Sequence, residues 1–148
     1  MNVANVDKAI AIMGRAVNLN MRFYQAKFHA GGSVSVLAAL KTEEELHRCG
    51  TSACFGGYIA VSKEFQADGG FVSTDGSPCI VSSVSGRRLE GHEALAYWFV
   101  ISETLAQMLV YGGTDEFGRG RFYGKPLKDV LAEDVIRVLQ QIKSGELQ

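Results

Sequence analysis

The chain has 148 residues, a length typical of one compact domain, and we expect a single domain over residues 1–148. Apolar residues make up 47% and charged residues 21%, as in globular rather than disordered chains. Fifteen Lys and Arg side chains against sixteen Asp and Glu give a formal charge of -1. This balance excludes a protein held on nucleic acid or anionic membrane by bulk charge, although it allows a local basic patch.

The beginning of the chain does not resemble an export signal. Asp7 and Lys8 precede its short apolar stretch, which predicts an amphipathic helix instead. No uninterrupted apolar run reaches the 18 residues of a membrane span. Cys49, Cys54 and Cys79 are odd in number and cannot all pair within the chain. We therefore expect reduced thiols and a cytoplasmic protein without membrane contact.

The first third of the sequence predicts a helix and then a strand. Apolar residues at steps of three and four form one helical face after an N-cap at Asn2 or Asn5: Val3, Val6, Ile10, Met13 and Val17. Apolar and polar residues alternate over residues 24–30, as in a half-buried strand. Residues 33–40 fit a strand or a helix equally well, and residues 42–50 begin with a capping box.

A second helix is expected from a cap at Thr51 or Ser52 to about Phe65. Gly56 and Gly57 cost such a helix roughly 0.8–1.0 kcal/mol each relative to Ala. We therefore expect both glycines to pack closely against another backbone element. Gly57→Leu should then destabilise the protein by roughly 1–3 kcal/mol through overpacking.

The remaining elements follow from turn and cap signals. Asp75-Gly76 predicts a hairpin within residues 67–86, and residues 90–97 and 102–111 predict two short helices. Residues 112–124 read as an irregular glycine-rich loop. Pro126 suits the first turn of a last helix ending at Gly145, with an apolar stripe of Leu127, Val130, Leu131, Val135, Val138, Leu139 and Ile142. The expected fold class is α+β: one compact, mostly helical domain with a small antiparallel sheet or hairpin.

One segment carries a resemblance: Cys49-Gly50-Thr51-Ser52-Ala53-Cys54-Phe55-Gly56-Gly57. It resembles the C-G-T-x-x-C-x-x-G segment of a group of small uncharacterised phage and prophage proteins, in which it opens a helix. Residues 91–109 and 134–145 fit the later helical parts of that group more loosely. The resemblance implies a mobile-element origin and an accessory role in an infected bacterium. It implies no activity, so no catalytic residue is carried over.

The cysteines and histidines offer two kinds of chemistry. Cys54 in a first helical turn would have a lowered thiol pKa, and His29, His47 or His92 could act as its base. The alternative, which we favour, is a small buried side chain without a catalytic role. A zinc site would need ligands from His47, Cys49, Cys54, Cys79 and His92, but their spacing lacks the paired pattern of such sites. We predict no catalytic residue, no metal and no cofactor.

Residues 96–109 have the spacing of a helix-turn-helix, with Ser102 capping the second helix. Val100 holds the turn position usually given to Gly, and the second helix lacks Lys and Arg for DNA. An ordinary helical hairpin is therefore the favoured interpretation.

The strongest binding signal lies in residues 115–125, where cations and aromatic residues alternate with glycines. Such side chains are common interface anchors and also stack on unpaired bases. The alternative is a solvated loop whose Phe122 and Tyr123 pack back onto the core. The predicted binding residues are Arg119, Arg121, Phe122, Tyr123 and Lys125.

These observations predict a phage or mobile-element accessory protein in the cytoplasm of a bacterial host. It would bind a host protein or ribonucleoprotein complex and could inhibit a bacterial defence complex. A small cysteine-dependent enzyme and a nucleic-acid-binding regulator are the alternatives. Nucleic acid is the less favoured partner, and a homo-oligomer is compatible with the sequence.

Overall fold

The computed structural model describes residues 1–16, 19, 21, 28–30, 51–73 and 76–148. It confirms an α+β protein in which helices dominate and the sheets are small and antiparallel. The helices are α1 (Val3–Gly14), α4 (Phe55–Val61), α5 (Lys63–Ala67), α6 (His92–Phe99), α7 (Glu103–Tyr111) and α8 (Ala132–Ser144), with a 3-10 turn η1 (Leu127–Asp129). The strands are β1 (Phe28–Ala30), β2 (Thr51–Ala53), β3 (Gly70–Val72), β4 (Pro78–Val81), β5 (Arg88–Glu90), β6 (Gly113–Thr114), β7 (Gly120–Phe122) and β8 (Lys125–Pro126).

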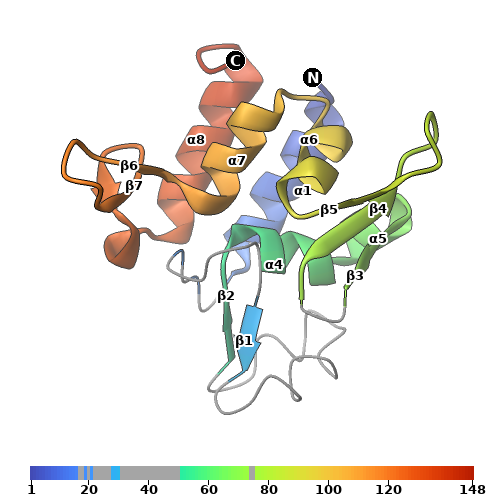
Figure 1. Cartoon of the computed structure of the whole chain (residues 1–148), viewed down its shortest axis with the longest axis horizontal. Helices are drawn as coiled ribbons and strands as arrows, with labels where there is room; N and C mark the ends of the chain where they lie inside the picture. Colours follow the sequence, from blue (N-terminus) through green and yellow to red (C-terminus); the bar gives the residue numbers. More distant parts are fainter. Residues whose placement is uncertain (17–18, 20, 22–27, 31–50, 74–75) are drawn as a thin grey trace.

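The helices form one body, with the strand pairs around its edges (Figure 1). Helices α1 and α8 lie side by side, α6 and α7 form a hairpin beside them, and α4 crosses beneath. The pair β1–β2 extends away from α4, while β3–β4–β5 and β6–β7–β8 lie on opposite sides of the body. None of the described helices is long and apolar enough to cross a membrane.

Helix α1 is confirmed, and its cap is Asn2, one of the two predicted candidates, whose side chain accepts the N–H of Asn5 at 3.3 Å. Its buried face differs slightly from the predicted stripe, because Val3 is exposed and Asn5 is buried. Asn5 tolerates burial because its Nδ2 donates to the carbonyl oxygen of Trp98 at 2.8 Å. Of the strand expected over residues 24–30, Phe28–Ala30 is present as β1. Residues 24–27 and the elements predicted in residues 31–50 lie outside the described residues.

The prediction of one helix from Thr51 or Ser52 to Phe65 is wrong in two places. Thr51–Ala53 is strand β2, which pairs antiparallel with β1, so Cys54 becomes the N-cap of α4. Ser62 then divides the helix, since its backbone is extended and its hydroxyl caps α5 by accepting the N–H of Phe65 at 3.3 Å. Every residue of α4 is buried, including Gly56 and Gly57, as expected for a helix surrounded by the core. The close backbone packing of these glycines stays a prediction.

The predicted hairpin is confirmed, with Phe71 opposite Cys79 across β3 and β4. A third strand, β5, ends at Glu90, where a helix was expected to begin, so α6 begins at His92. The helical hairpin of α6 and α7 is also confirmed, and Ser102 caps α7 by accepting the N–H of Leu105 at 3.2 Å. At its turn Val100 has the left-handed conformation usual for glycine, with φ 55°.

Residues 112–124 are not an irregular loop, because they contain strands β6 and β7. Pro126 is not in a helix but belongs to β8, and α8 begins only at Ala132. Leu131 is therefore exposed (58%) instead of buried. The rest of the predicted stripe is confirmed: Leu127 and Val130 are buried from η1, and Val135, Val138, Leu139 and Ile142 from α8. Gly145 ends α8 in a left-handed conformation, as predicted.

An aromatic cluster joins the elements at the centre. Phe65 and Trp98 meet edge to face with ring centroids 5.2 Å apart, and Phe99 lies 4.9 Å from Trp98. Phe99 in turn stacks on Phe55 of α4 at 6.3 Å. These contacts fix α6 against α4 and α5.

Candidate functional site

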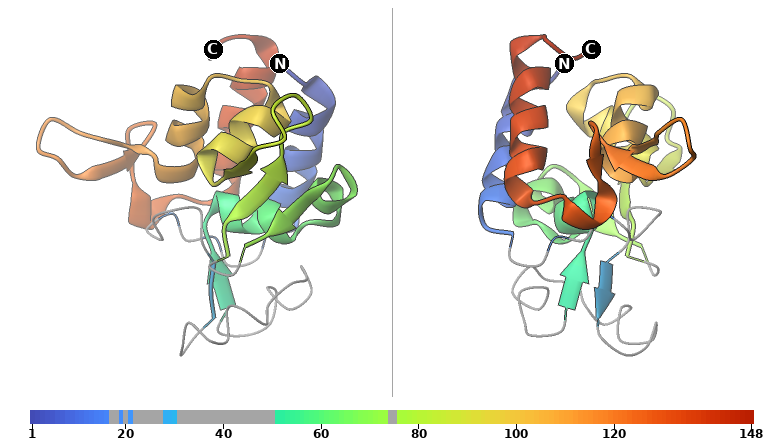
Figure 2. Two further views of the ribbon diagram at one scale, coloured as in Figure 1. Left: turned by 45° about the vertical axis from the view of Figure 1, so that its right-hand side comes forward. Right: turned by 90° about the vertical axis from the view of Figure 1, so that its left-hand side faces the viewer.

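The predicted binding segment is a three-stranded antiparallel ribbon over residues 113–126, here called the basic ribbon. Thr114 pairs with Gly120, and Arg121 with Pro126. The ribbon projects from the helical body, and its β6–β7 turn lies at the end of that projection (Figure 2). Its start is fixed by Gly112, where a Cβ would collide with the carbonyl oxygen of Arg121. The glycine therefore allows β7 to approach the end of α7 closely.

The β6–β7 turn is organised around the carboxylate of Asp115. Its Oδ1 accepts the backbone N–H groups of Phe117 and Arg119, each at 2.9 Å. Its Oδ2 accepts Nε of Arg119 at 2.8 Å and Nε of Arg121 at 3.1 Å. These contacts lower the pKa of Asp115 to about 2. The backbone N–H of Arg119 contributes most, and the N–H of Phe117 and the two guanidinium groups add to it. One ionised side chain thus holds the turn and both arginines in place.

Phe117 and Arg119 form an exposed pair at the outer end of the ribbon. The Phe117 side chain is 72% exposed, the largest exposure of any described aromatic residue. The Arg119 guanidinium carbon lies 4.9 Å from the centroid of its ring. The Arg119 guanidinium contacts Asp115 through Nε alone, so its terminal amino groups remain available to a partner. The pair combines an apolar face with directed cationic donors.

The structure does not place all five predicted binding residues on one surface. Arg121 lies beside Arg119 on Asp115, whereas Phe122 is 1% exposed and belongs to the core. Neighbouring residues of a strand point to opposite faces, which explains why Arg121 and Phe122 separate. Tyr123 is exposed in a two-residue turn, where its φ is 46° and that of Gly124 is 87°.

Lys125 lies at the base of the ribbon and not near its end. Its Nζ donates to Oδ2 of Asp134 at 2.6 Å and so joins β8 to the start of α8. Burial disfavours the charged form of Asp134, but Lys125 and the N–H of Leu131 hold its pKa below the usual range. Lys125 therefore anchors the ribbon to the helical body.

Sequence reasoning missed Asp115 and left Phe117 out of the binding set. A signal for Asp115 was present, because an Asp side chain that accepts the N–H two residues later is a common turn device, and Gly118 follows with φ 73°. Phe117 could have been recognised as the aromatic residue of that turn, since turn side chains do not alternate into the core.

The described cysteines lack the environment of a nucleophile. Cys54 is fully buried, and burial raises its pKa to about 11 despite its place at the start of α4. Burial and the neighbouring Glu90 carboxylate raise the pKa of Cys79 to about 11 as well. Among the described residues no group of three or more His, Cys, Asp and Glu side chains could hold a metal ion.

Comparisons of the chain with protein-family models, curated proteins and solved structures find no match.

Proposed function

We propose that this chain is an accessory protein of the phage and mobile-element type that binds a host protein or ribonucleoprotein complex through the basic ribbon. Inhibition of a bacterial defence complex is the role that such binding would serve. The observation that carries the proposal is the exposed Phe117–Arg119 pair, held in a fixed direction by Asp115 on a projecting ribbon. Aromatic and Arg anchors whose conformation is fixed beforehand lose little entropy on binding.

The charges of the turn favour a protein surface over a nucleic acid backbone. Asp115 pairs with both arginines and Glu116 lies exposed in the same turn, so two carboxylates balance the two guanidinium charges. Two carboxylates beside the arginines would repel phosphates, whereas a protein partner can offer single carboxylates or carbonyl oxygens to the Arg119 amino groups. The resemblance of residues 49–57 to phage and prophage proteins supports a partner in the bacterial host.

The two alternative functions have less support. A cysteine-dependent enzyme needs an accessible thiolate, and the burial of Cys54 works against one. A regulator that reads DNA with α7 needs cations on that helix, whose sequence ETLAQMLVY contains none. Glu103 at its start is exposed and would repel phosphates.

The test compares how much host protein three forms of the chain capture from a bacterial lysate, measured by quantitative mass spectrometry. The ribbon variant combines Phe117→Ser with Arg119→Ala. The matched control combines Val84→Ser at the β4–β5 turn, where Val84 is 92% exposed, with Lys63→Ala at the exposed start of α5. The proposal predicts a specific partner that the control retains and the ribbon variant loses. Equal capture by the ribbon variant and the wild-type chain would refute it.

A further inference from the structure

A second surface, remote from the basic ribbon, also has the properties of a binding site. A cavity of about 740 Å³ lies between α1, α6 and the β4–β5 strands. This volume is in the range of pockets that hold small ligands or a partner's side chain. The floor is apolar and includes Ile80, Leu89 and Ala96.

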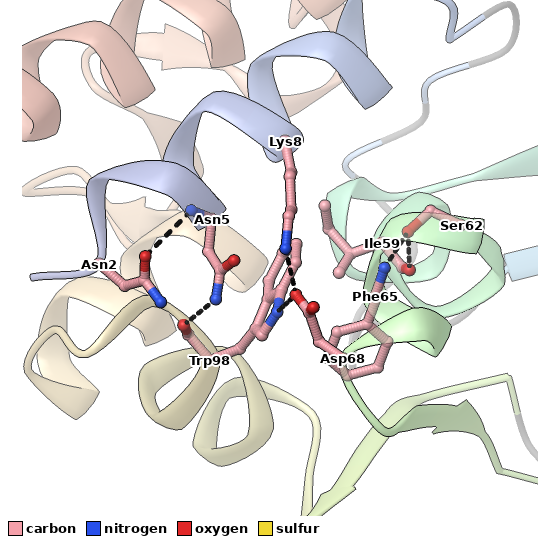
Figure 3. Close-up of polar contacts among 8 residues, drawn as sticks. All are labelled: Asn2, Asn5, Lys8, Ile59, Ser62, Phe65, Asp68 and Trp98. Atoms are coloured by element: carbon pink, nitrogen blue, oxygen red, sulfur yellow. Dashed lines mark hydrogen bonds and ion pairs between the residues drawn. The ribbon is translucent and has the colours of Figure 1, made fainter.

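Several side chains of the wall carry oxygen acceptors, and three of them are carboxylates. Asn5, Asp68, Glu93 and Glu103 all line the cavity. Asp68 receives Nε1 of Trp98 at 2.8 Å and Nζ of Lys8 at 2.6 Å, but both donors bind Oδ2. Figure 3 shows the two donors converging on that one oxygen. No described group donates to Oδ1 of Asp68, which leaves this oxygen for a ligand.

The ion pairs around the cavity leave an excess of negative charge. Lys8 balances Asp68, and Arg87 lies 3.3 Å from Glu93 in an exposed pair. Glu103 has no ionic partner among the described residues. Exposed pairs contribute little stability, so a ligand cation could replace Arg87 beside Glu93 without a large cost.

Asn5 gives an independent indication of a ligand. It is only 6% exposed, and its side chain reaches from α1 to Trp98 (Figure 3). Its Nδ2 is satisfied by the Trp98 carbonyl oxygen, whereas no described group donates to its Oδ1. A buried acceptor without a donor costs free energy and is uncommon in folded proteins. A ligand that donates hydrogen bonds would remove this cost.

We propose that this cavity binds a guanidinium or primary ammonium group carried on an apolar arm. The cationic head would donate to Asn5, Asp68 and Glu103, while the arm would lie on the apolar floor. Two sources have this chemistry: a free small amine or guanidine, and an Arg or Lys side chain of a partner protein. The site would be occupied independently of the basic ribbon.

Trp98 makes the proposal easy to test, because it is the single Trp of the chain and lines the cavity. Butylguanidinium is titrated into the isotope-labelled protein at physiological salt, and NMR follows the Trp98 indole N–H and the Asn5 side-chain amide. Butylurea is the uncharged control of almost the same shape. We expect saturable shifts of both signals with butylguanidinium and none with butylurea.

One double variant removes charge from the wall with little change in shape, and a single variant on another element is its control. Asp68→Asn combined with Glu103→Gln should weaken binding about tenfold, whereas Glu133→Gln on α8 should leave it unchanged. A capped peptide with one Arg distinguishes the sources: tighter binding than butylguanidinium assigns the site to a partner side chain, and equal or weaker binding to a free small cation. The absence of saturable shifts at both signals, equal binding of butylurea, or an unaffected double variant would overturn the proposal.

Discussion

Asp134→Lys is expected to be strongly destabilising, although Asp134 lies outside the apolar stripe that the sequence predicts for the last helix. The Asp134 side chain is 12% exposed and accepts the N–H of Leu131 at 2.9 Å and Nζ of Lys125 at 2.6 Å. Leu131 is the N-cap residue but has no polar side chain, so Asp134 supplies the cap of α8.

The magnitude follows from the contacts that are lost. Loss of the cap costs about 1 kcal/mol. Replacing an acid by a cation at a helix N-terminus costs about 0.5–1 kcal/mol, and the lost pairs with Lys125 and Arg137 add about 0.5–1 kcal/mol. The free energy of unfolding should therefore fall by about 2–3 kcal/mol. For a chain of this length the Tm should fall by about 5–10 °C.

Urea denaturation measures this loss, provided that the slope m stays unchanged. Glu133→Lys is the matched control, because it makes the same change of charge in the same helical turn at an exposed position. Glu133→Lys should lower the free energy of unfolding by only about 0.5 kcal/mol, through its unfavourable interaction with the helix dipole. Asp134→Asn keeps an oxygen for the Leu131 N–H and should fall between the two. If Asp134→Lys costs no more than Glu133→Lys, the capping role of Asp134 is refuted.

Three further predictions concern the helix face, the ribbon and the thiol. Val135→Ala should lower the free energy of unfolding by about 1.5–3 kcal/mol because Val135 is fully buried, whereas Leu131→Ala should lower it by less than about 0.5 kcal/mol. Urea denaturation measures both values, and equal losses would contradict the assigned face of α8. The lowered pKa of Asp115, about 2, means that the folded ribbon binds fewer protons than the unfolded one. The ribbon should therefore be fully ordered above about pH 4 and should lose its order as the pH falls towards 2. NMR shifts of the ribbon amides that stay native at pH 2 would contradict this. The pKa of the Cys54 thiol is about 11 in the folded chain, against the ordinary 9.0. Iodoacetamide at neutral pH should therefore alkylate Cys54 about a hundredfold more slowly in the folded than in the unfolded chain. Peptide mass spectrometry measures the two rates, and equal rates would show an accessible thiol.

The elements that the sequence predicts well depend on local signals. Asn2 and Ser102 cap their helices through their own side chains, and Gly145 ends α8 with a backbone conformation that suits glycine. The hairpin of β3 and β4 likewise follows from its turn residues and flanking apolar runs. Such signals need no knowledge of the rest of the chain.

The elements that the sequence misses depend on distant partners. Thr51–Ala53 is a strand because it pairs with Phe28–Ala30, far away in the sequence. Lys125–Pro126 is too short to show a strand pattern and is fixed by pairing with β7. Once Pro126 is held there, α8 has to begin later, at Ala132, and Leu131 becomes exposed.

The candidate site was predictable in composition but not in geometry. The clustering of Arg and aromatic residues singled out residues 115–125, which in the structure belong to the projecting ribbon. The sequence could not show that Phe122 points into the core while Phe117 points outward, because the register of a short ribbon depends on its contacts with α7 and η1. The sequence also could not show that Lys125 lies apart from Arg119 and Arg121, because its position depends on its ion pair with Asp134 of α8.

The most direct test of partner binding by the basic ribbon is site-specific photocrosslinking in bacterial cells. A photoreactive benzoyl-phenylalanine is placed at the position of Phe117, and in a parallel protein at the position of the more exposed Val84 on the β4–β5 turn. Binding through the ribbon predicts a discrete covalent adduct of one partner from the first position and none from the second. An adduct formed only from the Val84 position, or no adduct from the Phe117 position while the partner is still captured, would contradict it.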